Sequence, residues 1–167
     1  MSMSHIDEPK DGDSAFVRIG AAMARMRIMV GRRYIGRLAI SRVGAGMELS
    51  HLDALSLIRR LGLEQEVTVG AIAEQLRIDH SRASRIVADL VKRGVVRRAA
   101  SQEDGRRTIV TLTRDGVQWL DQVNGVKMEV LSKVLDDWSP EETAAFAELY
   151  TRFIERLEAQ AKDFDDK

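Results

Sequence analysis

The sequence predicts a mainly α-helical protein with one short β-hairpin in its second half. Apolar residues recur at steps of three and four over most of the 167 residues, which is the period of an amphipathic helix. Two stretches rich in β-branched residues, 95–99 and 108–112, flank a polar segment containing Gly105 and predict the hairpin. Capping residues mark where most of the helices begin. The expected order is four helices, the hairpin and two more helices.

Length and composition restrict the class of protein. A chain of 167 residues, 44% apolar and 31% charged, fits one domain or one compact protomer. It has no cysteine, which excludes disulfide scaffolds, cysteine-ligated zinc and thiol catalysis. No apolar run approaches the roughly 18 residues that a membrane span needs, and residues 1–13 do not resemble a signal peptide. We therefore expect a cytoplasmic protein with a disordered acidic tail at residues 1–13.

The first predicted helix covers residues 15–40 and follows Ser14 as its N-cap. The glycine-rich segment 43–46 predicts a turn after it. A second helix is expected from Ser50, which has capping-box spacing to Asp53, as far as Leu61. The apolar stripe of the first helix consists of Phe16, Ile19, Met23, Met26, Val30, Tyr34 and Leu38.

Two helices then follow in close succession. Thr68 predicts the start of a helix over 69–76, and Asp79 predicts the start of one over 80–93. On the second of these helices, apolar and polar residues separate onto opposite faces. The apolar face consists of Ala83, Ile86, Val87 and Leu90, and the polar face consists of Ser81, Arg82, Arg85, Asp89 and Lys92. Two helices joined by a short turn and followed by a β-hairpin form the winged helix-turn-helix pattern.

Two helices are expected after the hairpin. Thr113 predicts the start of a helix that extends towards Asp137, with a kink or strained turn at Asn124-Gly125. Ser139-Pro140, with glutamates following, predicts the start of the last helix. The last helix is expected to bury Phe146, Leu149, Phe153, Leu157 and Phe164.

The polar face of the helix over 80–93 has the chemistry of a helix that reads DNA. The major groove admits an α-helix, and an arginine can donate two hydrogen bonds to guanine. Arg82 and Arg85 could serve in this way, while Lys92 could neutralise a phosphate. His80 could contact a phosphate or simply lie at the surface. A solvated polar face is the alternative for the whole helix.

The hairpin strengthens the DNA-binding interpretation. It carries Arg106 and Arg107 near its tip, and a narrow minor groove attracts such side chains electrostatically. Asp104 could orient Arg106 across the turn, although a turn residue is an equally good local explanation of this aspartate.

Three runs of residues occur together within residues 67–116. They are Asp79-His80-Ser81-Arg82-Ala83-Ser84-Arg85-Ile86-Val87, then Asp104-Gly105-Arg106-Arg107, then Val110-Thr111-Leu112-Thr113 with Gly116. In spacing and in kind, they resemble the DNA-binding lobe of the MarR family of bacterial transcriptional regulators. The resemblance implies a homodimer formed through the first and last helices. It also implies release from DNA by a small anionic or phenolic effector. The two recognition helices of such a dimer predict a pseudo-palindromic operator, and repression is the default expectation, since the sequence shows no separate activation domain.

The resemblance also implies a division of the chain and a set of site residues. Residues 48–114 would form the winged helix-turn-helix domain, and residues 14–47 and 115–167 would form the dimerisation region. Candidates for an effector pocket are Tyr34, His51 and Trp119, with Arg33 placed to neutralise a ligand carboxylate; packing or surface charge is the alternative for each. In the DNA-binding set, the resemblance implies Ser81, Arg82, Ser84, Arg85, Asp104 and Arg106. The polar helix face and the hairpin add His80, Lys92 and Arg107, although Arg107 stands where the family often has a small or apolar residue.

The net charge of zero conceals a strong polarity along the chain. Residues 14–42 contain seven arginines and no acidic residue, whereas residues 121–167 contain twelve acidic and six basic residues. Such a distribution is informative about partners. The arginines of the first helix could pair with the acidic C-terminal helices, within or between chains. Alternatively, some of them could contact DNA or an anionic ligand.

The sequence gives no basis for catalysis or for a bound metal or cofactor. The three histidines are far apart and lack the spacing of metal ligands. No nucleophile stands beside a base, and no carboxylate pair lies in a glycine-rich setting. We therefore expect a regulator rather than an enzyme. The competing hypothesis is a winged-helix module for protein–protein interaction, or an anti-regulator, that has lost DNA binding.

Overall fold

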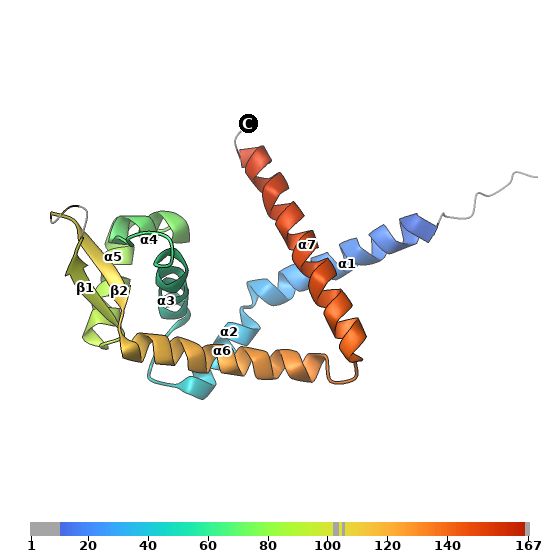
Figure 1. Ribbon diagram of the computed structural model, residues 1–167, viewed down its shortest axis with the longest axis horizontal. Helices are drawn as coiled ribbons and strands as arrows, with labels where there is room; N and C mark the ends of the chain where they lie inside the picture. Colours follow the sequence, from blue (N-terminus) through green and yellow to red (C-terminus); the bar gives the residue numbers. More distant parts are fainter. Residues whose placement is uncertain (1–10, 102–103, 105, 166–167) are drawn as a thin grey trace, which may run out of the picture. The chain divides into compact units, whose positions relative to one another are not determined.

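The computed structural model describes residues 11–101, 104 and 106–165, and within them it confirms the mainly helical class with one two-stranded antiparallel sheet (Figure 1). The chain divides into two compact units, with the boundary after Val126. The elements are α1 (Asp11–Gly31), α2 (Tyr34–Val43), α3 (Leu49–Leu61), α4 (Val69–Leu76), α5 (His80–Lys92), β1 (Val96–Ala100), β2 (Thr108–Leu112), α6 (Arg114–Val134) and α7 (Pro140–Asp165).

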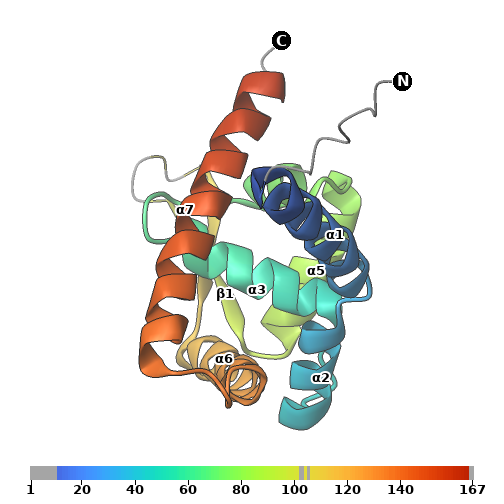
Figure 2. The same cartoon turned by 90° about the vertical axis from the view of Figure 1, so that its right-hand side faces the viewer.

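The hydrophobic core of the first unit is built by α3, α4, α5, the hairpin and the start of α6. Leu55 and Ile58 on α3 are fully buried, as are Ile72 on α4 and Leu90 on α5. Figure 2 shows α3 together with α2 and α5, both of which contact it. Burying one such aliphatic side chain contributes about 1.5–3 kcal/mol, so this core fixes the position of α5 within the unit.

The hairpin is tied to the core from two sides. Its register pairs Val96 with Leu112, and the Val110 N–H donates to the Val67 carbonyl over 2.7 Å. On the other side, the first turn of α6 packs directly on the backbone before β1. A Cβ added at Gly116 would lie only 2.0 Å from the Val95 carbonyl oxygen, so this close approach requires a glycine.

The single helix that we expected over 15–40 is wrong, because the structure breaks it into α1 and α2. Arg33 adopts a left-handed conformation with φ of 51°, which helical backbone does not allow. The apolar stripe continues across the break and therefore conceals it. The first helix also begins earlier than expected, at Asp11, inside the segment 1–13 that we assigned to a tail. Residues 1–10 lie outside the described part of the chain.

The start of α3 also differs from the expectation. Its N-cap is Glu48 rather than Ser50, and the backbone N–H of Glu48 donates to His51 Nδ1 over 3.0 Å. A histidine therefore takes the place of the usual Glu or Gln at the third helical position. The turn before it was predicted correctly, since Gly44, Ala45 and Gly46 all have positive φ.

No kink or turn interrupts α6 at Asn124-Gly125, where we expected one. The helix runs without a break from Arg114 to Val134. Val123 is fully buried and Val126 packs against the core, and this packing holds the segment in a helix. Tertiary contacts therefore override the local preference of Asn-Gly for a tight turn.

The second unit contains the end of α6 and the whole of α7. As predicted, Ser139 caps α7: its hydroxyl accepts from the Glu142 N–H over 3.1 Å, and the Ser139 N–H donates to the Glu142 carboxylate over 2.8 Å. The expected burial of the apolar face of α7 is wrong for the described residues of this single chain. Phe146, Leu149, Phe153 and Leu157 are 37–53% exposed, and the side chain of Phe164 lies outside the described residues.

None of the helices in the described part of the chain is long and apolar enough to cross a membrane.

Candidate nucleic-acid interface

Helix α5 presents a charged face to solvent because its opposite face is locked in the core. Ala83, Val87 and Leu90 are fully buried, whereas Arg82 and Arg85 are exposed. Asp79 begins the helix as predicted, since its carboxylate accepts from the Arg82 N–H over 2.8 Å. Of the other predicted contact residues, the structure exposes His80, Ser81 and Lys92 and half-buries Ser84.

A sharp turn sets α5 against α4. Arg77 ends α4 in a left-handed conformation with φ of 52°, and the Ile78 N–H donates to the Ala73 carbonyl over 3.0 Å. The side chain of Thr68 begins α4 by accepting from the Ala71 N–H. Two short helices held at a fixed turn, with the second exposed along one side, are the geometry with which helix-turn-helix proteins enter a major groove.

The one carboxylate on the polar face of α5 is neutralised within the protein. Asp89 Oδ2 accepts from Arg93 Nε over 2.8 Å and lies 3.0 Å from His51 Nε2 on α3. The hydrogen bond from Arg93 lowers the pKa of the Asp89 carboxyl group. The remaining charged side chains of this face, on Arg82, Arg85 and Lys92, are positive.

The tip of the wing carries exposed arginines on a backbone that Asp104 shapes. The Asp104 carboxylate accepts from the Arg106 N–H over 3.0 Å, which is a turn-forming contact with the backbone. The side chains of Arg106 and Arg107 are exposed. Gly105, which we expected at the tip, lies outside the described residues.

Sequence reasoning missed two further cations on the wing. Arg97 and Arg98 on β1 are both exposed, which adds positive charge to the strand that contacts α5. The available signal was the pair of consecutive arginines, because a half-buried strand is expected to alternate apolar and polar residues. The polar contacts of His51 were also missed, because they join distant parts of the sequence.

Within the described part of the chain, the four candidates for an effector pocket lie in different surroundings. The guanidinium of Arg33 binds both carboxylate oxygens of Asp53 on α3, and Tyr34 is 54% exposed. His51 is buried, with both ring nitrogens engaged. Of the four, Trp119 lines a hollow of about 350 Å³; the other lining residues are Ala45, Met47, Arg93, Val95, Asp115, Gln118 and Gln122.

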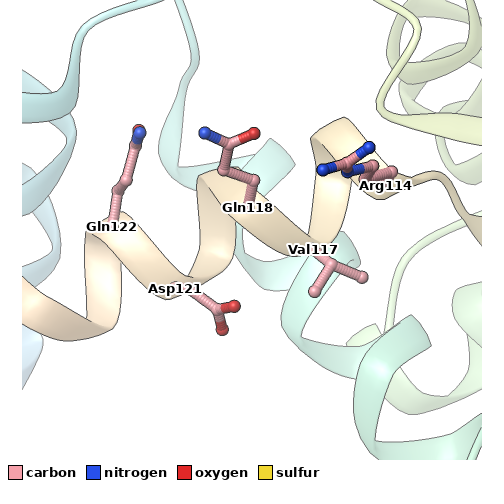
Figure 3. Close-up of a pocket in the computed structure, with 5 residues that line it drawn as sticks. All are labelled: Arg114, Val117, Gln118, Asp121 and Gln122. Atoms are coloured by element: carbon pink, nitrogen blue, oxygen red, sulfur yellow. The ribbon is translucent and has the colours of Figure 1, made fainter.

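A larger hollow lies over α6 but has no convergent chemistry. Its volume is about 720 Å³, and all five lining residues come from one helix. Figure 3 shows that Gln118 and Gln122 point to one side of α6 while Asp121 and Val117 point to the other. Side chains that diverge in this way cannot surround a ligand, so the polar face of α5 and the wing remain the candidate site.

Comparisons with known proteins agree with this fold. Residues 45–107 match a family model described as MarR family. The chain is 31% identical over 96 residues to YxaD, an uncharacterised HTH-type transcriptional regulator of Bacillus subtilis, and the match covers 58% of this chain and 67% of that protein.

Solved structures share the same fold. A MarR family protein from Bacillus stearothermophilus superposes with a TM-score of 0.71 at 16% identity, over 87% of this chain and 97% of that one. MepR of S. aureus in complex with DNA gives a TM-score of 0.59 at 17% identity, over 82% and 98% of the two chains. MepR has also been solved bound to ethidium bromide.

Proposed function

The chain belongs to the MarR family of helix-turn-helix transcriptional regulators. We propose that it is a homodimeric repressor that acts in the cytoplasm. It binds a pseudo-palindromic operator and leaves this DNA when a small molecule binds. The observation that carries the proposal is the face of α5, where exposed Arg82 and Arg85 lie opposite fully buried Ala83 and Val87.

In this proposal α5 reads the major groove and the wing enters the minor groove. Arg82 and Arg85 donate to base edges, and Lys92 neutralises a phosphate. His80, Ser81 and Ser84 lie at the start of the same face, where hydroxyl and imidazole groups suit phosphates. Arg106 and Arg107 bind a narrow minor groove, with Asp104 shaping the turn that carries them.

A second copy of the chain is the proposed cover for the exposed apolar residues of α1 and α7. In the single chain, Phe16 is 77% exposed and Val30 is 64% exposed, and Leu149 on α7 is 53% exposed. Soluble proteins rarely leave contiguous apolar faces of this kind open to water. We assign residues 14–47 and 115–167 to the dimerisation region and residues 48–114 to the DNA-binding domain.

The charges of the two terminal regions support the same association. The seven arginines of residues 14–42 and the acidic excess of residues 121–167 are of opposite sign. Exposed ion pairs contribute only about 0–1 kcal/mol each to the free energy of association. We therefore propose that they determine which helices pair and in which register. Burial of the apolar faces supplies most of the association energy.

The effector in this proposal is small, and anionic or phenolic. The hollow beside Trp119 supports an apolar part of this effector, because Met47 and Val95 line it, and an anionic group there would have to compete with Asp89 for Arg93. An anionic effector at the α1–α2 break would instead have to compete with Asp53 for Arg33.

Fluorescence anisotropy with labelled DNA from upstream of its own gene tests the proposal. A scrambled duplex of equal length and two salt concentrations provide the reference. We expect selective binding that falls steeply with salt, as counterion release requires. Arg85→Ala and Arg106→Ala should each weaken binding of the folded protein, while Arg60→Ala on α3 serves as a matched control.

Equal, weak binding to both duplexes by a folded dimer, with Arg85→Ala and Arg106→Ala without effect, would contradict the proposal. That result would favour the protein-interaction module instead.

A further inference from the structure

The N-terminal part of α3, which carries His51 and Asp53, is held by polar contacts on two sides. On one side, the carboxylate of Asp53 binds the guanidinium of Arg33, which lies at the break between α1 and α2. The break itself is conformationally defined, since Arg33 is the residue in the left-handed conformation. A movement of α1 relative to α2 must therefore act on the residue that holds Asp53.

On the other side, His51 connects this part of α3 to α5. The residue is 5% exposed, and its Nδ1 accepts from the Glu48 N–H over 3.0 Å. Since Nδ1 is an acceptor, the neutral ring carries its proton on Nε2, 3.0 Å from the Asp89 carboxylate. Both nitrogens of the ring are thus engaged, which fixes the orientation of the ring between the two helices.

Asp89 also connects α5 to the segment before α3, through Arg93. It also accepts from Arg93, and Arg93 Nη1 donates to the Ala45 carbonyl over 3.1 Å. Ala45 lies in the turn of positive φ that joins α2 to α3, with φ of 65°. Asp89 on α5 and Arg93, which caps the end of α5, are therefore connected to the N-terminal end of α3 and to the turn before it.

We propose that the N-terminal part of α3 couples the α1–α2 break to the recognition helix, so that a change at Arg33 alters operator binding through Asp53, His51 and Asp89. This inference rests on the proposed function, because it takes α5 as the DNA-reading helix. His51 and Arg33 are positioning residues in it and do not contact DNA.

The core explains why such a coupling acts on position rather than on folding. Leu55 and Ile58 of α3 are buried in the same cluster as Val87 and Leu90 of α5, and this apolar packing holds the two helices together. Directional hydrogen bonds add a preference for one register. A helix displaced by about 1 Å keeps most of its apolar burial and lengthens the 3.0 Å contact between His51 Nε2 and the Asp89 carboxylate, so the attraction between these groups weakens.

A double-mutant cycle on operator binding tests the coupling. We expect Arg33→Ala to weaken operator binding about two- to tenfold and His51→Ala to weaken it by a similar or larger factor, within the range of site-to-site couplings. In the double variant Arg33→Ala should add little further loss, because the connection is already broken. Arg33→Lys should restore part of the affinity, and Arg32→Ala is the matched control.

The salt dependence separates positioning from contact. Neither Arg33→Ala nor His51→Ala should change the slope of log Kd against log salt or the affinity for scrambled DNA, since no phosphate contact is lost. A reduced slope for Arg33→Ala would mean that this arginine contacts DNA, and would overturn the coupling. Additive losses, or an unchanged operator affinity for Arg33→Ala, would also overturn it.

Hydrogen–deuterium exchange without DNA distinguishes a failure of the coupling from a failure of the proposed function. Arg33→Ala should speed exchange of the amides of residues 80–92 when His51 is present, and should not speed it further in the His51→Ala background. Wild-type protein that fails to select the operator would contradict the proposed function alone. Exchange in α5 that is unaffected by Arg33→Ala would contradict the coupling alone.

Discussion

His51 on α3 and Asp89 on α5 lie 3.0 Å apart, from Nε2 to Oδ2, and Arg93 shares the same carboxylate. We have proposed that this side of α5 faces DNA, where a negative charge would oppose the phosphates of the duplex. In the structure this conflict does not arise, because the Asp89 carboxylate contacts two basic side chains, those of His51 and Arg93. The polar face of α5 can therefore carry an aspartate without losing its positive character.

The lowered pKa of Asp89 predicts a pH-dependent effect of Asp89→Asn on stability. The hydrogen bond from Arg93 lowers this pKa from its ordinary value of 3.8. A carboxylate with a lowered folded-state pKa stabilises the fold above the unfolded-state value, and this stabilisation is lost as the pH falls through the folded-state value. Asp89→Asn should thus reduce the urea midpoint at pH 7 and have little effect at the lowest pH at which the chain stays folded.

Asp136→Asn, in the exposed segment after α6, is the control for this series. A midpoint difference between wild type and Asp89→Asn that stays constant from pH 7 to below pH 3.8 would mean that the charge of Asp89 is not what stabilises the fold.

Gly116 predicts a second effect on stability. An added Cβ would lie 2.0 Å from the Val95 carbonyl oxygen, and this atom belongs to backbone that holds the wing. Gly116→Ala should therefore destabilise the fold by about 2–3 kcal/mol. In the same helix, a Cβ at Gly125 meets no described atom within 4 Å, so Gly125→Ala should stabilise by about 0.5–1 kcal/mol.

Urea unfolding of the two alanine variants measures the difference between these glycines. Equal midpoints would show that α6 and the wing do not make the close contact described here.

Local chemistry made several elements predictable from the sequence. Thr68, Asp79 and Ser139 each begin a helix through a side-chain contact within three residues, so the signal lies within a short window. The hairpin was recognised in the same way, from its β-branched strands. The whole-chain prediction of a winged helix followed from the order of these short signals.

The missed features depend on contacts between distant segments. The left-handed conformation of Arg33 accompanies an ion pair with Asp53 on another helix, and arginine itself has no preference for it. Asn124-Gly125 has a real turn preference that the packing of Val123 overrules. The contact of His51 with Asp89 exists only once α3 and α5 have packed.

The apolar face of α7 predicts the oligomeric state. Leu149→Asp should convert a dimer to monomers, because a charge at a buried interface is costly without a partner. Thr151→Asp introduces the same charge on the opposite side of the helix by spacing and should leave the dimer intact. Sedimentation velocity at several concentrations measures the outcome. A wild-type monomer, or a Leu149→Asp dimer as stable as wild type, would contradict the proposed assembly.

Arg85 and Lys92 predict two different signatures in DNA binding, although both are exposed on α5. Arg85 is proposed to donate to a base, so Arg85→Ala should cost about 1–3 kcal/mol on the operator and relax selectivity at one position. Lys92 is proposed to pair with a phosphate, so Lys92→Ala should weaken all duplexes alike and reduce the salt slope by about 1. Anisotropy titrations on operator and scrambled DNA at several salt concentrations separate the two. If Lys92→Ala lost selectivity while Arg85→Ala changed the slope alone, α5 would lie in the groove with its C-terminal half towards the bases, the reverse of the orientation proposed here.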